Sequence, residues 1–154
     1  MLRYTLIPEG YFSQDKARDL LSQVVVLEKA DSVKSLELPC YKAVLVYAGD
    51  DAAARCLSGM LETAAALTCY NKVVMHLGDE AADIVVAAGD RLLLCNSYPA
   101  ADPVTAQYFL FAALRQFQIN PQVTTVHFYG EAGETIKGDL FRHFASVEVI
   151  DSSL

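Results

Sequence analysis

The chain has 154 residues, 53% apolar and 20% charged, so it is long enough to bury a core and too apolar to be disordered. Nineteen acidic against twelve basic residues give a net charge of −7, which argues against nucleic acid as a partner. No apolar run approaches the roughly 20 residues that span a bilayer, and the start MLRYTLIPEG lacks the apolar core of a signal peptide. We therefore expect a cytoplasmic protein without membrane insertion.

Residues 1–50 are predicted to form a small α/β subdomain. Ser13 is a candidate N-cap for a helix over Gln14–Gln23. Apolar and β-branched runs predict strands at Arg3–Ile7, Val24–Leu27 and Ala43–Tyr47. Ser35–Leu38 alternates weakly between apolar and polar residues and is a further candidate strand.

A linking helix is predicted within residues 51–70. Gly49, Asp50 and Asp51 end the preceding strand and can cap a helix. Its apolar residues recur at helical spacing from about Ala52 to Leu67, which indicates a stripe that faces a core.

From Lys72 onward, residues 71–154 predict the order strand, strand, strand, helix, strand, helix, strand. Gly89 and Asp90 suit a tight hairpin turn, while Asp102 and Pro103 suit the N-cap and first position of a helix. The predicted elements are Val73–Leu77, Asp83–Ala87, Leu92–Ser97, a helix over 103–118, Val123–Tyr129, a helix over Glu134–Phe144, and Val147–Ile150. This βββαβαβ order, with a mixed sheet flanked by helices, is that of the ribonuclease-H-like fold, the half-unit of actin-like ATPases. The alternative is a generic α/β sandwich.

The first loop of interest joins the first two of these strands, in VMHLGDEAADIVV. It resembles the second phosphate motif of actin-like ATPases, with Gly78 in register. His76, however, stands where the catalytic Asp of that motif would be. Asp79 and Glu80 stand where small residues would face a phosphate, and carboxylates repel one.

Other interpretations of this loop remain open. Asp79, Glu80 and Asp83 could hold a metal ion, although an ordinary solvated acidic turn is the simpler interpretation. His76 could be a catalytic base, although a histidine with satisfied hydrogen bonds at a strand edge is the simpler interpretation. We assign no catalytic residue, no metal and no cofactor.

The second loop follows the strand VHFYG and reads Gly130-Glu131-Ala132-Gly133. It resembles the adenosine motif of the same superfamily, in which two glycines follow the strand. Here Gly130 remains and Glu131 replaces the second. Gly78, Asp79, Gly130 and Glu131 are therefore the candidate residues of a vestigial nucleotide site. In the alternative, Gly130 serves a turn with positive φ and Glu134 the first turn of a helix.

With these loops placed, the chain resembles an uncharacterised bacterial domain family related to actin-like ATPases. It is more distantly similar to the actin-like protein of type IV pilus assembly. The stretches HLGDEAADIVVAAGDRLLLCNSYP and TTVHFYGEAGETIKGDLFRHF carry the likeness best, and YTLIPEGYF with AVLVYAGDDAAARCLSGMLETAAAL resembles the preceding subdomain and helix. The resemblance implies a fold and no established reaction.

Actin-like proteins close over ATP with two such halves, and this chain has room for one. We expect either a missing half before Met1 or a protein partner, including a homodimer. The helix after Pro103 supports this, because apolar residues cover nearly its whole circumference and predict burial on two sides. Tyr108 and Phe111 are candidate interface residues. Burial against a helix of the same domain is the alternative.

Cys40, Cys56, Cys69 and Cys95 form no CxxC pair and lie far in sequence from the histidines. This spacing is not typical of a zinc site. We expect reduced, mostly buried thiols, and a Cys–His nucleophilic pair that meets only in space stays open.

Three functions follow. The leading hypothesis is a non-catalytic interaction or scaffold domain with a degenerate actin-like fold. The rival is an ATP-binding or ATP-hydrolysing protein that acts through a longer two-lobed chain. A ribonuclease-H-type nuclease is disfavoured, because strand one offers no carboxylate for a metal pair.

Overall fold

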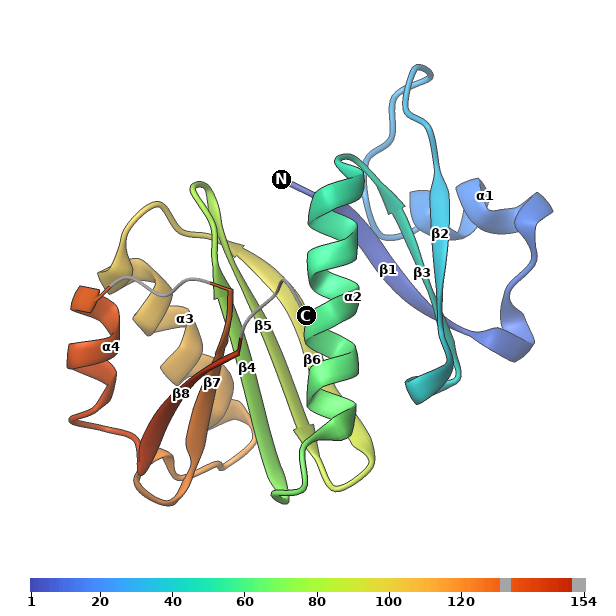
Figure 1. The fold of residues 1–154 in the computed structure, drawn as a ribbon. Helices are drawn as coiled ribbons and strands as arrows, with labels where there is room; N and C mark the ends of the chain where they lie inside the picture. The colour runs from blue at the N-terminus through green and yellow to red at the C-terminus, as the bar shows by residue number, and fades with distance from the viewer. Residues whose placement is uncertain (131–133, 151–154) are drawn as a thin grey trace. The chain divides into compact units, whose positions relative to one another are not determined.

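The computed structural model describes residues 1–130 and 134–150, and they divide into two compact units, Met1–Glu62 and Thr63–Leu154. Figure 1 shows the elements of each unit. The boundary falls within the helix α2, Asp51–Ala66. Five of its apolar residues are buried, as its periodicity predicts: Ala54, Leu57, Met60, Leu61 and Ala64.

The first unit is built on an antiparallel sheet in the order β1-β3-β2. Its strands are β1 (Arg3–Pro8), β2 (Lys34–Leu38) and β3 (Ala43–Ala48). The helix α1 (Ala17–Ser22) covers one face of β3, because Ala17 and Leu21 share a buried cluster with Val44 and Val46. The short 3₁₀ turns η1 (Glu9–Tyr11), η2 (Gln14–Lys16) and η3 (Pro39–Tyr41) complete the unit.

The helix predicted over Gln14–Gln23 is shorter than its sequence pattern indicates. Ser13 is extended and precedes the turn η2, but its side chain makes no capping hydrogen bond. Without that bond the segment begins as a 3₁₀ turn, and the α-helix itself starts only at Ala17.

The strand predicted at Val24–Leu27 is wrong, because this segment forms a turn and an irregular loop. Arginine side chains bind one backbone carbonyl of this segment and two of the loop that follows it. Arg3 Nη1 donates to the Val26 carbonyl over 3.0 Å, and Arg18 donates to those of Glu28 and Asp31, over 2.6 Å each. Apolar, β-branched composition therefore does not decide the conformation here.

Asp31 fastens the same loop to β1. Both of its carboxylate oxygens accept hydrogen bonds from Arg3, over 2.7 and 2.9 Å, and Oδ2 also accepts from the Glu28 amide. The Arg3 guanidinium, followed by the Glu28 amide, holds the pKa of the Asp31 carboxyl well below its usual range.

The second unit contains a five-stranded mixed sheet in the order β6-β5-β4-β7-β8. The strands β4 (Asn71–Leu77), β5 (Ala81–Ala88) and β6 (Arg91–Pro99) form an antiparallel meander. The strands β7 (Thr125–Tyr129) and β8 (Ser146–Ile150) run parallel to β4. This order confirms the predicted βββαβαβ half-unit.

Two helices, α3 (Pro103–Gln116) and α4 (Glu134–Leu140), lie on the same face of this sheet (Figure 1). The 3₁₀ turn η4 (Pro121–Val123) leads from α3 into β7. Leu110 and Leu114 of α3 share a core with Ile136 and Leu140 of α4 and with the inward residues of the strands, among them Phe128. The core is thus closed by helices on this side.

Asp102 caps α3 as its sequence predicts. Its Oδ1 accepts from the Thr105 amide over 2.8 Å, its Oδ2 accepts from the Thr105 hydroxyl over 2.8 Å, and Pro103 occupies the first helical position. The Thr105 bonds lower the pKa of the Asp102 carboxyl.

Candidate functional site

The two loops singled out in the sequence meet at one edge of the five-stranded sheet. The strands β4 and β7 are parallel neighbours, with Val74 opposite His127 and Met75 opposite Phe128. Parallel strands end at the same edge, so Gly78 after β4 and Gly130 after β7 lie at adjacent strand ends. In open α/β sheets, this edge is where ligands bind.

The turn after β4 uses the backbone of Gly78 for the hairpin itself. The Gly78 amide donates to the Ala81 carbonyl over 2.9 Å. Gly78 does not need a positive φ, but an added Cβ would lie 3.3 Å from the Ala81 carbonyl oxygen, so the turn is tight at this point. Asp79 and Glu80 are exposed at its tip, and the Glu80 carbonyl accepts from the Ala100 amide over 3.0 Å.

The loop after β7 begins with a residue in the left-handed region. Gly130 has φ +84°, as the turn interpretation of its glycine requires. Its amide donates to the Ile150 carbonyl over 2.9 Å and so extends the ladder between β7 and β8. Glu131, the other candidate residue of this loop, lies outside the described residues.

Beside the acidic turn, His76, Asp83 and Ser97 form a polar row across β4, β5 and β6. Asp83 pairs with His76 on one side and with Ser97 on the other. His76 Nδ1 lies 3.2 Å from Asp83 Oδ2, and the Ser97 hydroxyl donates to Asp83 Oδ1. The His76 and Asp83 side chains are 28% and 22% exposed, so the row is half-buried.

The order of this row does not make a nucleophile. In a serine hydrolase the histidine stands between the hydroxyl and the carboxylate and takes the proton from the hydroxyl. Here Asp83 stands in the middle, and the Ser97 hydroxyl donates to a carboxylate. The geometry therefore gives His76 and Ser97 the same carboxylate partner.

The sequence names His76 and Asp83 separately and Ser97 only as the end of a strand. The hairpin register could have found the first pair, because a turn at Gly78–Ala81 places His76 opposite Asp83. The Gly89-Asp90 turn alone would place Asn96 opposite Asp83, and the register shift between Val86 and Ala87 brings Ser97 there instead.

Within residues 1–130 and 134–150, no three His, Cys, Asp or Glu side chains come close enough to hold a metal ion. Asp83 was one of the three acids of the alternative metal site, and its two oxygens bond to His76 and Ser97 instead. Asp79 and Glu80 are exposed residues of the turn.

The structure separates the two candidate interface residues on α3. The Phe111 ring packs edge-on against His143 and stacks on Phe144, with centroids 5.2 and 5.8 Å apart, so it is half-buried within its own unit. Tyr108 is 65% exposed and Val104 is 75% exposed. This part of α3 is therefore not covered by its own unit, and whether a partner covers its second side stays a prediction.

The cysteines are free thiols, as expected, but they are less buried than expected. Cys40 and Cys69 are exposed, and Cys56 and Cys95 are partly buried. Cys40 belongs to η3, and Cys69 lies in the connection from α2 to β4, where neither faces a core. Although the residue is exposed, desolvation of its thiol, followed by the Glu62 carboxylate, raises the pKa of Cys40.

Residues 54–145 match the model of a family described as protein of unknown function (DUF3822). The chain belongs to this family. Its structure is also similar to the crystal structure of a protein with an actin-like ATPase fold and unknown function from Bacteroides thetaiotaomicron, with a TM-score of 0.76 and 18% sequence identity. The likeness covers 96% of this chain and 65% of that one, so this chain spans about two thirds of the length of its neighbour. A comparison with curated proteins found no match.

For this DUF3822 member, the comparison confirms the predicted fold. At 18% identity the likeness shows the actin-like ATPase fold alone. In the parts that the structure describes, no helix has both the length and the apolar character needed to span a membrane.

Proposed function

We propose that this chain is a non-catalytic protein-interaction or scaffold domain with a degenerate actin-like ATPase fold. The observation that carries the proposal is that two glycine backbone amides already donate hydrogen bonds within the sheet. The Gly78 and Gly130 amides, which a phosphate loop would offer to a nucleotide, donate to the carbonyls of Ala81 and Ile150. A loop that cradles phosphate must leave such donors pointing at the ligand.

Charge at the same edge supports the proposal. Asp79 and Glu80 are exposed on the turn where a phosphate would have to approach. A carboxylate about 4–6 Å from a triphosphate costs about 1 kcal/mol or more at intermediate dielectric. This repulsion would have to be overcome without the backbone donors described above.

The polar row supports the absence of catalysis at this site. Actin-like ATPases place an acidic residue near the end of the first strand of this half-unit, where it orients metal and water. In this chain that strand is β4, and His76 stands at the matching position. Asp83, the nearest carboxylate on the neighbouring strand, is bonded to His76 and Ser97. Both carboxylate oxygens of Asp83 are thus engaged within the row and are not offered to a metal ion.

An exposed apolar strip on α3 supports the interaction role. Tyr108 and Val104 are one helical turn apart, both are more than half exposed, and tyrosine is enriched among residues that dominate binding energy. The partner in this proposal is a protein, which could be the other lobe of a longer chain or a second copy. Four free thiols fit a cytoplasmic location.

The domain organisation belongs to the same proposal. Residues 1–50 form the small subdomain, residues 51–70 the linking helix and residues 71–154 the ribonuclease-H-like half-unit.

ATP binding through a longer two-lobed chain is the second candidate function. One observation favours it: Gly78 and Gly130 follow adjacent parallel strands, at the edge where nucleotides bind in α/β sheets. In addition, Gly130 has a left-handed φ and no side chain, which permits a close backbone approach at this residue.

Thermal denaturation of the full-length protein with millimolar MgATP separates the two functions. A ligand at 100 times its Kd adds about 2.7 kcal/mol of stability, and we expect no such shift. Gly130→Glu blocks the second loop, and Gly138→Glu is the matched control, since a side chain at 138 meets open space. A shift that Gly130→Glu abolishes and Gly138→Glu preserves would overturn the proposal in favour of ATP binding.

A further inference from the structure

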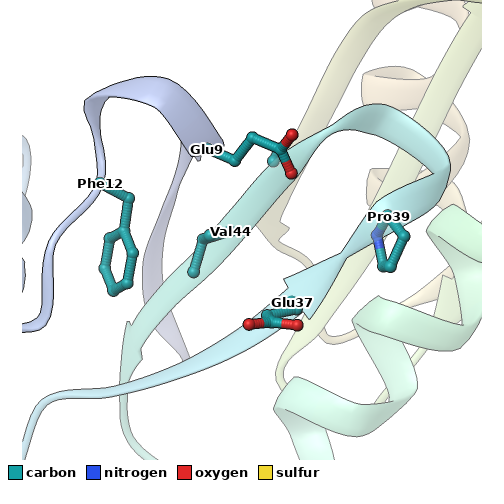
Figure 2. A pocket seen from close by; sticks show the side chains of 6 residues that line it. Glu9, Phe12, Glu37, Pro39 and Val44 are labelled. Carbon is teal, nitrogen blue, oxygen red and sulfur yellow. The ribbon is translucent and has the colours of Figure 1, made fainter.

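The first unit contains a hollow of about 200 Å³ at the end of its sheet. Figure 2 shows its lining side chains, with Val44 between Phe12 and the two glutamates. The lining residues come from η1 and its C-terminal flank, from the end of β2, from η3 and from the start of β3: Glu9, Phe12, Glu37, Pro39, Ala43 and Val44.

The sheet register builds the floor and one side of this hollow. Glu37 on β2 lies opposite Val44 on β3, so both side chains are on the face that α1 covers farther along the strand. Val44 is 5% exposed and belongs to the core, and Phe12 packs against the same core. The hollow therefore has an apolar floor and an aromatic wall beyond the end of α1.

The backbone fixes Glu9 on the other side. Its amide donates to the Lys42 carbonyl over 3.0 Å, and this bond joins η1 to the turn between β2 and β3. Lys42 has φ +51°, a left-handed conformation that the turn imposes. Glu9 is thus held at the hollow by the fold and does not depend on a side-chain contact.

The two carboxylates give the hollow its charge. Glu9 and Glu37 are exposed, and within the described part of the chain neither makes an ion pair. No lining residue is basic. A pair of carboxylates above an apolar floor and beside an aromatic ring attracts a cation with an apolar stem.

We propose that this hollow receives an arginine or lysine side chain of a protein partner. The methylene stem packs on Val44 and beside Phe12, and the cationic group lies between Glu9 and Glu37. The volume agrees with one long side chain, because pockets for whole cofactors and drug-sized ligands hold about 300–1,000 Å³. That the hollow binds a cation is argued from its own residues. That the cation belongs to a protein rests on the proposed interaction function.

Titration of the full ¹⁵N-labelled chain with short blocked peptides tests the proposal. The probes are Ac-Ala-Arg-Ala-NH₂ and Ac-Ala-Lys-Ala-NH₂, with Ac-Ala-Gln-Ala-NH₂ as the neutral control and spermidine as a free cation. We expect the basic peptides to shift the amide resonances of Glu9, Phe12, Glu37 and Val44, less so as salt rises, and the neutral peptide to leave them in place.

Charge-removing variants locate the site. Glu37→Gln should weaken binding of the arginine peptide roughly two- to five-fold, the range expected of an exposed ion pair, and Glu9→Gln should weaken it further in the double variant. Glu28→Gln is the matched control, because Glu28 lies away from the hollow. Its amide bonds to Asp31, and Asp31 bonds to Arg3 at the opposite end of β1 from Glu9.

Equal shifts with the neutral peptide, or unchanged binding to the double variant, would overturn the proposal. Binding of spermidine without binding of either basic peptide would overturn the assignment of the cation to a protein partner, and the ligand would then be a free polyamine. The MgATP assay does not involve this hollow, so failure here and failure of the proposed function give different results.

Discussion

His76 Nδ1 lies 3.2 Å from Asp83 Oδ2, and the two residues face each other across the β4–β5 ladder. Asp83 also accepts from the Ser97 hydroxyl, so one carboxylate serves residues on two neighbouring strands. His76 is thereby bound to the neighbouring strand of the sheet. This arrangement has a measurable consequence for stability.

Asp83→Ala should lower the free energy of unfolding by about 1–3 kcal/mol, because two half-buried partners lose their acceptor. Urea denaturation measures this loss. Asp79→Ala, at the exposed tip of the same hairpin, is the control and should change stability by less than about 0.5 kcal/mol. Equal losses in both variants would show that the polar row does not contribute to stability.

Asp31→Asn should change how stability depends on pH. The pKa of Asp31 is lowered in the folded chain, chiefly by Arg3, so its contribution is present above the unfolded carboxyl pKa of about 4 and is lost as the pH falls toward the folded value. Tm values between pH 7 and pH 2.5 should show wild type above the variant at pH 7, with the gap closing below about pH 4. Asp15→Asn in η2 should show no such closing gap.

Asp102→Ala should lower Tm by about 2–4 °C, because α3 loses the acceptor at its N-cap. Asp102→Asn keeps an oxygen for the Thr105 amide and should lose less. Differential scanning calorimetry of the three proteins checks the order. An alanine variant as stable as the asparagine variant would contradict the role of this cap.

Two glycines should respond in opposite directions to alanine. Gly130→Ala places a Cβ on a residue with φ +84° and should cost about 1 kcal/mol. Gly138→Ala in α4 meets open space and should stabilise by about 0.4–1 kcal/mol. Urea denaturation of both variants tests the pair, and destabilisation by both would indicate a general intolerance of this region.

The two faces of α3 should differ sharply. Leu110→Ala removes a fully buried side chain and should cost about 2–5 kcal/mol. Tyr108→Ser, on the exposed side, should stay within about 0.5 kcal/mol of wild type. If Tyr108→Ser unfolds the isolated chain, the exposed strip is part of its core and does not support an interface.

Most of the second unit was predictable because local and global signals agree there. The strands of the meander carry β-branched residues, Gly89 permits the positive φ of the hairpin turn, and Asp102 with Pro103 starts α3 at the predicted residue. The same agreement is missing at residues 24–27. There Arg3, distant in sequence, donates to the Val26 carbonyl, Arg18 donates to the Glu28 carbonyl just beyond, and no local pattern reports such contacts.

The site was predictable in its parts and not in its connections. The two glycine loops were found, because glycine after a strand is a local signal. That their amides donate to Ala81 and Ile150 depends on hairpin geometry and on the position of β8, which the sequence does not state. The pairing of Asp83 with Ser97 likewise depends on the register shift between Val86 and Ala87 in the β5–β6 hairpin.

The parallel pairing of β4 with β7 also bears on the order of folding. It joins residues roughly fifty positions apart, such as Val73 and Val126, whereas the meander joins near neighbours in sequence. Closing so long a segment costs entropy before any native contact repays it. The antiparallel ribbon can therefore assemble early, and the edge that unites both glycines becomes complete only in a late step of the chain's collapse.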